Sequence, residues 1–301
     1  MQMINPSVAL IEESDPFKKI ERVGRTCYKS EDMITGDSAK KFYNGLVKRQ
    51  HTAMVEHTTF VFEVDSETYF KLHGYKFLNY SINEESERFL ISGNLRALNE
   101  SGEPTLLKAL HDLDPDLVYV PHPINFEDNH DEVKVVNIKD YEDLSVEEFM
   151  AHAYFTFHFI TDRGVTHEMV RHRPASYAQE STRYCNYSKD KFGGEITYIK
   201  PTGWDEFKHY DKLQFVKAFE SCEAEYNELI KRGFSPQQAR AVLPNALKTE
   251  IIMTTNAGEF EHFFDLRSRG ITGAPHPDIK VVADMALGLY SCEKFALIGI
   301  M

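Results

Sequence analysis

Residues 171–184 place the strongest constraint on how this chain can fold, because they gather charged and hydroxyl side chains that all need partners. The stretch reads RHRPASYAQESTRY and holds three arginines, one histidine, two serines and two tyrosines. An arginine guanidinium carries a rigid fork of donors that fits the oxygens of phosphates and carboxylates. Serine hydroxyls and free backbone N–H groups can complete such an anion site. The stretch therefore predicts a site for a phosphorylated, planar ligand.

A second interpretation of the stretch needs no ligand. Glu168 and Glu180 lie close enough in sequence to neutralise two of its arginines, which would make it an internal salt-bridge cluster. The residue types alone leave both interpretations open. A metalloprotease motif is not indicated, because His167 and His172 are five residues apart. Five steps of about 100° put them on different faces of a helix, and we expect no metal site.

The overall charge argues against one class of partner. The chain of 301 residues has 47 acidic and 34 basic side chains, a formal net charge of −13. A general nucleic-acid binder would normally show a basic face, whereas a small anionic ligand can still be held by a local arginine cluster. No apolar run approaches the roughly 20 residues that a membrane span needs, and residues 1–17 do not resemble a secretory signal. We expect neither nucleic acid nor a membrane as partner.

The four cysteines predict reduced thiols rather than disulfides or a metal site. Cys27, Cys185, Cys222 and Cys292 form no CxxC pair and no tight cluster. This usage fits a cytoplasmic protein. Cys185 borders the arginine-rich stretch and is a candidate nucleophile, with a partly buried, unreactive thiol as the other interpretation.

Hydrophobic patterning predicts strands and helices throughout the chain. Strands are expected at residues 7–11, 58–64, 89–95 and 154–160. Helices are expected at residues 16–23, 38–48, 69–80, 165–173, 211–232 and 278–295. Residues 250–255 fit either a strand or a helix. Residues 112–145 are acidic and contain prolines, which indicates a surface excursion or lid.

Four segments, in the same order, resemble motifs of the flavin-dependent thymidylate synthases. Arg171–Arg173 followed after seven residues by Ser181 resembles the RHRX7S signature. Residues 51–57 resemble the HxTxxEH segment, residues 239–244 the AR-x-VLP segment, and residues 256–267 the N-x-R…F-x-x-LR segment. The resemblance covers most of residues 1–64 and 150–301.

The resemblance implies a fold and a reaction. The fold is of the α/β (α+β) kind, with a mixed or antiparallel sheet flanked by helices. A single catalytic domain would span residues 1–301, with a long lid-like or subunit-contact insert at about 65–150. The reaction is reductive methylation of deoxyuridylate (dUMP) to thymidylate (dTMP), with FAD as cofactor, methylenetetrahydrofolate as carbon donor and NADPH as reductant. The family forms homotetramers whose active sites are shared between subunits.

The resemblance also assigns residues. Cofactor contacts fall on His51, Ala53, Glu56, Arg171, His172, Arg173, Gln179, Asn256 and His262. Substrate contacts fall on Glu168, Arg171, Gln179, Glu180, Ser181, Thr182, Arg183, Arg240 and Arg267. Among these, Ser181 and Arg183 would hold the phosphate, and Arg240 would come from another subunit. Arg267 is the catalytic candidate, because its fixed charge beside the uracil ring would stabilise the ionised pyrimidine nitrogen and make carbon 5 nucleophilic.

Four positions depart from the family pattern. Ala53 replaces a threonine, Ala178 an asparagine, Gln179 a glutamate, and Gly258 an arginine that holds FAD in many members. Two alternatives therefore stay open beside the synthase. One is a nucleotide hydrolase or phosphotransferase, although the stretch carries no aspartate cluster for a divalent metal. The other is a nucleotide-binding protein without catalysis that kept the phosphate and flavin pocket.

Overall fold

We describe the fold from a computed structural model of the chain, which describes residues 1–120, 133–183, 187 and 195–299. The candidate nucleophile Cys185 lies outside the described residues, as does Tyr184 at the end of the arginine-rich stretch. The described cysteines Cys27, Cys222 and Cys292 form no disulfide. Across the described ranges, no helix combines the length and apolarity needed to cross a membrane.

The described part of the chain contains three sheets. The first has four antiparallel strands in the order β2 (Ser7–Leu10), β7 (Tyr154–Asp162), β10 (Lys248–Asn256) and β8 (Ser176–Gln179). The second is also antiparallel, in the order β4 (Leu78–Asn83), β5 (Arg88–Asn94), β3 (Thr59–Val64) and β6 (Val133–Val136). The third is a short parallel pair, β1 (Gln2–Ile4) with β9 (Thr197–Ile199).

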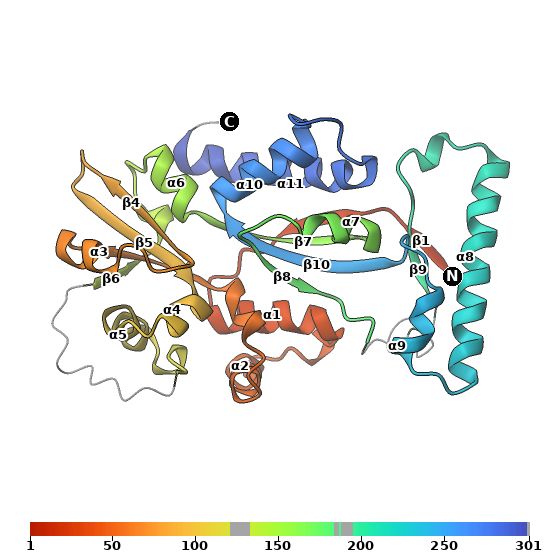
Figure 1. The fold of residues 1–301 in the computed structure, drawn as a ribbon, viewed down its shortest axis with the longest axis horizontal. Helices are drawn as coiled ribbons and strands as arrows, with labels where there is room; N and C mark the ends of the chain where they lie inside the picture. Colours follow the sequence, from red (N-terminus) through yellow and green to blue (C-terminus); the bar gives the residue numbers. More distant parts are fainter. Residues whose placement is uncertain (121–132, 184–186, 188–194, 300–301) are drawn as a thin grey trace.

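Helices cover both faces of the first sheet (Figure 1). Helices α10 (Ala257–Phe264) and α11 (Pro277–Ile298) lie on one face. Helix α1 (Pro16–Tyr28) lies on the other face, with α2 (Ser38–Lys48) beyond it. The predicted fold class, a mixed or antiparallel sheet flanked by helices, is confirmed.

The alternation of side chains along β7 explains why its two faces differ. Phe155, Phe157 and Phe159 point to one face and are buried in the core that α10 and α11 complete. Thr156 and His158 point to the opposite face, as a strand period of two requires. Burying the three rings stabilises the sheet, while the polar face is left to hydrogen-bonding side chains.

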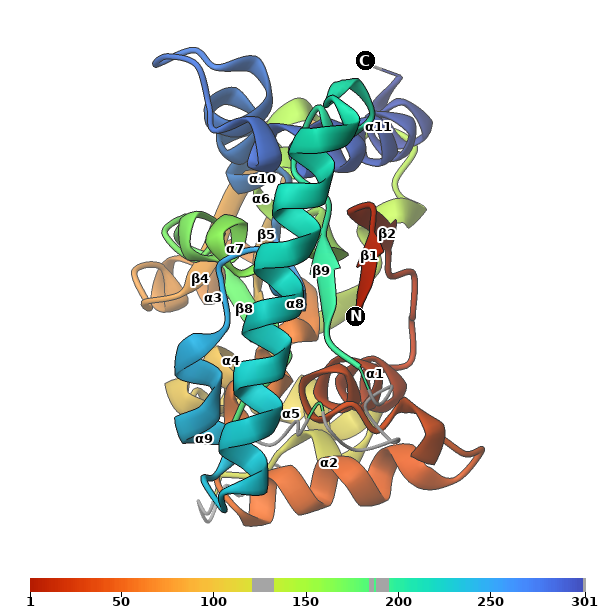
Figure 2. The same ribbon diagram turned by 90° about the vertical axis from the view of Figure 1, so that its right-hand side faces the viewer.

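Helix α8 (His209–Lys231) runs along one end of the molecule beside α9 (Pro236–Ala239) (Figures 1 and 2). The large apolar side chains of this helix are only partly covered. Phe219 and Tyr226 are buried, whereas Tyr210 is 68% exposed and Leu213 is 48% exposed. The chain itself therefore leaves large apolar side chains of α8 in contact with solvent.

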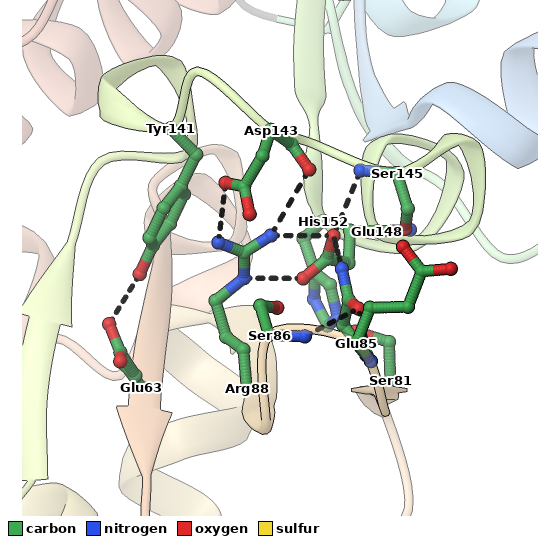
Figure 3. A network of polar contacts seen from close by, with 11 residues as sticks. Glu63, Ser81, Glu85, Ser86, Arg88, Tyr141, Asp143, Ser145, Glu148 and His152 are labelled. Carbon is green, nitrogen blue, oxygen red and sulfur yellow. Dashed lines mark hydrogen bonds and ion pairs between the residues drawn. The ribbon is translucent and has the colours of Figure 1, made fainter.

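Residues 65–150 supply three of the four strands of the second sheet. Their helices are α3 (Ser66–Leu72), α4 (Leu95–Ser101), α5 (Pro104–Leu113) and α6 (Val146–His152). Side chains of α4 and α5 share one core with side chains of α1 and α2. Arg88 of β5 reaches the carboxylate of Glu148 in α6 and ties the sheet to that helix (Figure 3). A role of this segment as lid or subunit contact stays a prediction.

Three expectations about local structure need correction or completion. The helix expected at 69–80 ends at Leu72, because the chain turns at Gly74 and then pairs with β5 as strand β4. The helix expected at 165–173 is α7 (Arg163–Met169), which begins earlier because the carboxylate of Asp162 caps it. Residues 250–255 belong to β10, which pairs with strands on both sides.

Candidate functional site

A cavity of about 620 Å³ is lined by residues of both four-stranded sheets. One part of its lining comes from the segments that carry motifs: Glu56, Thr59, Arg173, Pro174, Ala175, Ser176, Thr254, Thr255 and Asn256. The other part comes from the 65–150 segment and the start of β7: Phe77, Asn79, Asn94, Arg96, Ala97, Glu100 and Tyr154. Its volume suits a small organic ligand or part of a larger one.

Three of the predicted cofactor residues meet in this cavity, although they are far apart in sequence. Glu56 is the last residue but one of the short 3₁₀ helix η2 (Thr52–His57). Its carboxylate accepts a hydrogen bond from Arg96 at 2.9 Å. Arg173 donates from Nε to the carbonyl of Val170 at 3.2 Å and has no carboxylate partner among the described residues. Its remaining N–H groups are thus available to an anion or a carbonyl oxygen.

The third residue, Asn256, is occupied by a structural role. Its Oδ1 accepts from the backbone N–H of Glu259 at 2.9 Å, which caps α10. Its Nδ2 donates to the carbonyl of Ala151 at 3.3 Å. Asn256 therefore shapes the cavity wall mainly by fixing where α10 begins.

Arg267 lies in a second group of predicted residues, outside the lining of the cavity. Its Nη1 donates to Glu168 at 2.6 Å and its Nε donates to Nε2 of His172 at 3.0 Å. Burial first, and then the nearby Arg267 charge, lower the pKa of His172 to about 4. His172 is thus neutral at pH 7 and can accept this hydrogen bond. The ring of His262 lies 6.1 Å from the ring of His172, so it belongs to the same group.

The backbone around Arg267 is a π-helical turn, η9 (Asp265–Arg269), that continues α10. Such turns insert an extra residue into a helix and are frequent at functional sites. The predicted catalytic arginine is thereby placed against two other predicted residues, Glu168 and His172. The sequence motif carries no signal for the π-turn itself.

The remaining predicted substrate residues form a third group at the far end of β8. Arg240 donates to the hydroxyl of Thr182 at 2.6 Å, within the same chain. The side chain of Gln179 donates to the hydroxyls of Thr166 at 2.9 Å and Thr249 at 3.3 Å. Arg183 is exposed, and its backbone N–H donates to the hydroxyl of Ser181 at 3.3 Å. Among the described residues, no hydrogen bond or ion pair joins Gln179 or Arg240 to Arg267.

The interpretation of the arginine-rich stretch as an internal salt-bridge cluster expected the wrong partners for Glu168 and Glu180. Glu168 pairs with Arg267, which comes from outside the stretch. Glu180 pairs with Lys248 at 3.0 Å and accepts from the hydroxyl of Tyr187 at 3.2 Å. Among the described residues, neither carboxylate forms an ion pair with Arg171 or Arg173.

The remaining predicted cofactor residues lie apart from the cavity lining. His51 and Ala53 are exposed at the start of η2, and Arg171 is exposed after α7. No group of three or more His, Cys, Asp or Glu side chains is arranged to hold a metal ion within the described ranges.

Packing explains two departures from the family pattern. Ala178 is 1% exposed and packs with Val23 and Cys27 of α1, where an asparagine would bury an amide. A Cβ on Gly258 would lie 3.2 Å from the carbonyl oxygen of Met150 in α6. The close approach of α6 to α10 thus favours glycine at this position.

Sequence reasoning missed a buried polar cluster on the α1 face of the first sheet. The carboxylate of Glu250 is in contact with the ammonium groups of Lys29 and Lys248 and lies 2.9 Å from Nε2 of His158. Burial alone would raise the pKa of Glu250, but these partners lower it. The alternating charged residues of β10 could have indicated this cluster. Using that signal required knowing that residues 250–255 form a strand.

Comparisons with known proteins agree on one family. A family model described as thymidylate synthase complementing protein matches residues 9–150 and 137–291. A flavin-dependent thymidylate synthase of Geobacter sulfurreducens is 38% identical over 125 residues, which are 41% of this chain and 52% of that protein. One of Pyrococcus furiosus is 40% identical over 123 residues, which are 40% of this chain and 49% of that protein. The chain thus spans about half the length of the curated relatives that it matches.

Solved structures give a weaker likeness. The UMP/dUMP methylase PolB of Streptomyces cacaoi, bound with 5-Br dUMP, has a TM-score of 0.44 and 15% identity. The match covers 97% of this chain and 93% of that one. A likeness at this level carries no functional argument.

Proposed function

The chain belongs to the thymidylate synthase complementing protein family, and we propose that it is a flavin-dependent thymidylate synthase. In this proposal it methylates dUMP reductively to dTMP, with methylenetetrahydrofolate as carbon donor, NADPH as reductant and FAD as cofactor. The supporting observation is the cavity in which Glu56, Arg173 and Asn256 come together from three separate motif segments.

The residues of the cavity fit FAD chemically. Arg173 offers a cation that no described carboxylate neutralises, which suits a phosphate or a ring carbonyl. Thr59 and Ser176 line the same space, and their hydroxyls can satisfy sugar or ring atoms. When bound, FAD would pass reducing equivalents from NADPH to the carbon being transferred.

In the proposed reaction, Arg267 acts on the pyrimidine ring of dUMP. Its hydrogen bond to neutral His172 and its ion pair with Glu168 fix the plane of the guanidinium before a ligand arrives. A fixed positive charge beside the ring would stabilise the anion that develops as carbon 5 becomes nucleophilic. Glu168, already within reach of Arg267, would hold the substrate there.

A complete nucleotide site would need a second copy of the chain. Ser181 and Arg183 follow the C-terminal end of β8, and the hydrogen bond from Arg240 to Thr182 places Arg240 beside them. We propose a homotetramer in which neighbouring copies combine these groups. The exposed Tyr210 and Leu213 of α8 support self-association of this kind.

The proposal is tested with the purified full chain. Protein with bound flavin should be yellow and should bleach on reduction by NADPH. With dUMP and methylenetetrahydrofolate added, it should form dTMP. The variant Arg173→Ala should bind FAD more weakly, whereas Arg232→Ala, at an exposed arginine of the α8 end, should not. Protein that takes up no FAD, or that forms dTMP equally well without it, would contradict the proposal.

One observation favours a second candidate, a dUMP-binding protein without catalysis. Gln179 directs its amide group to Thr166 and Thr249, so that group is engaged by the chain itself. This candidate predicts saturable dUMP binding, with no dTMP formed when FAD, methylenetetrahydrofolate and NADPH are all present. The same assay therefore separates the two functions.

A further inference from the structure

The 65–150 segment forms one wall of the cavity. The resemblance assigns no cofactor or substrate contact to the residues of this wall. Six of the lining residues belong to it: Phe77, Asn79, Asn94, Arg96, Ala97 and Glu100. Tyr154, the first residue of β7, lies next to them in the lining. The wall thus joins the second sheet to the first.

Asn79 and Tyr154 form a hydrogen-bonded pair at this junction. Nδ2 of Asn79 donates to the hydroxyl of Tyr154 at 2.5 Å. Tyr154 is the register partner of Asn256 on β10, and Asn79 is the register partner of Ser92 on β5. The pair is therefore anchored by both sheets, which fixes where its polar atoms lie.

A buried histidine, His152, is connected to this pair through the hydroxyl of Ser92. Nδ1 of His152 lies 2.7 Å from the hydroxyl of Ser92, and its Nε2 lies 2.9 Å from the hydroxyl of Ser81. Ser92 in turn reaches the hydroxyl of Tyr154 at 3.5 Å. His152 is 1% exposed, and burial lowers its pKa to about 4, so it is neutral at pH 7. Figure 3 shows His152 beside Ser81 and the Arg88 network.

The wall offers hydrogen bonds from uncharged groups and carries no excess positive charge. Oδ1 of Asn79 has no hydrogen-bond partner among the described residues, so it can accept one from a ligand. Arg96 is held between two carboxylates, Glu56 at 2.9 Å and Glu100 at 2.7 Å, so these three side chains together carry one negative charge. Phe77 is 78% exposed and presents an aromatic ring to the same space. An amide, a phenol and an aromatic ring suit a flat polar heterocycle better than a phosphate.

We propose that Asn79 and Tyr154 recognise the amide-like edge of a planar, uncharged heterocycle in this cavity. The inference rests on the proposed function, in which the uracil of dUMP lies beside Arg267, outside the lining of this cavity. Two such rings then remain for the cavity, the flavin of FAD and the pterin of the folate. Both carry adjacent carbonyl and N–H groups, which match an acceptor and a donor held side by side. The 65–150 segment is then a specificity wall of the site.

The test compares two cavity variants with one matched control. Asn79→Ala removes the amide, and Tyr154→Phe removes one oxygen while keeping the ring. Asn83→Ala makes the same change on the same strand, but Asn83 contacts Glu148 at 3.0 Å and does not line the cavity. FAD affinity is measured by quenching of flavin fluorescence. Tetrahydrofolate affinity is measured on the FAD-loaded protein by the change in flavin absorption, and thermal melting is recorded for all variants.

The ring ligand should bind about five- to tenfold more weakly to both cavity variants, the loss expected for one neutral hydrogen bond. Weaker FAD binding identifies the flavin, and weaker tetrahydrofolate binding alone identifies the pterin. Asn83→Ala should lower the melting temperature and leave both affinities unchanged. Affinities for FAD and tetrahydrofolate equal to wild type in both folded cavity variants would overturn the inference. Wild-type protein that takes up no FAD would instead refute the proposed function.

Discussion

Removing the charge of Arg88 should destabilise the protein more than any change at an exposed ion pair. Arg88 is 7% exposed and donates to the carboxylate of Glu148 at 2.5 and 2.8 Å, and Glu148 is 1% exposed. Arg88 also lies over the ring of Tyr141 at 4.2 Å. Taking away one partner of a buried pair leaves the other charge uncompensated, which costs about 3–5 kcal/mol. We therefore expect Arg88→Met to lower the free energy of unfolding by about that amount.

The pKa of Glu148 gives an independent magnitude. Burial would raise this pKa, but the hydrogen bonds from Arg88 and its other donors lower it from 4.5 to about 2. At about 1.4 kcal/mol per pH unit, this difference corresponds to about 3 kcal/mol. Because the folded pKa lies below the unfolded one, the contribution is complete above pH 4.5 and is lost as the pH falls toward 2. The stability gap between wild type and Arg88→Met should therefore narrow below pH 4.5.

The measurement is urea unfolding followed by circular dichroism at pH 7 and pH 4. Arg232→Met is the matched control, because Arg232 pairs with Glu228 on the surface at 68% and 48% side-chain exposure. It should change stability by less than about 1 kcal/mol. The double variant Arg88→Met/Glu148→Gln should be more stable than the sum of the single changes predicts. A loss below about 1 kcal/mol for Arg88→Met, or a gap that does not depend on pH, would refute this reasoning.

Three further predictions concern the proposed site and its support. Arg267→Ala should fold normally but lose about 100-fold or more in turnover, because the developing anion loses its charge partner; unchanged dTMP output would remove its catalytic role. Arg183→Ala should weaken dUMP binding about tenfold in a titration, because a charge-assisted contact to phosphate is lost; an unaltered affinity would exclude it from the phosphate site. Gly258→Arg should lower unfolding stability by about 1–3 kcal/mol, since its Cβ would press on the Met150 carbonyl; a melting temperature equal to wild type would contradict that contact.

Local pattern in the sequence predicted the elements whose signal is local. The alternating Phe155, Phe157 and Phe159 predicted strand β7. The helix expected at 69–80 was carried too far, into strand β4, because Leu78 and Tyr80 fit a helix as well as a strand. The pairing of β4 with β5 decides the structure, and pairing is not visible in the segment itself.

The sequence predicted several residues of the candidate site, but not which of them contact one another. The motifs selected Glu168, His172 and Arg267 separately, yet their contacts join residues 95 and 99 positions apart. Asn79 and Tyr154 could not be selected at all, because they belong to no motif and meet only when the two sheets pack together. Contacts of this kind depend on the tertiary fold, which local sequence patterns do not encode.

The loop after α7 sends two successive side chains to different places. His172 receives the hydrogen bond of Arg267, whereas Arg173 lines the cavity. One peptide unit thus connects the two regions, so a ligand that displaces the backbone at one of them alters the other. A ligand in one region changes the binding free energy at the other region by the same amount as a ligand there changes it at the first. Under the proposed function, the overall affinity of the protein for FAD and dUMP together is therefore independent of the order in which they bind.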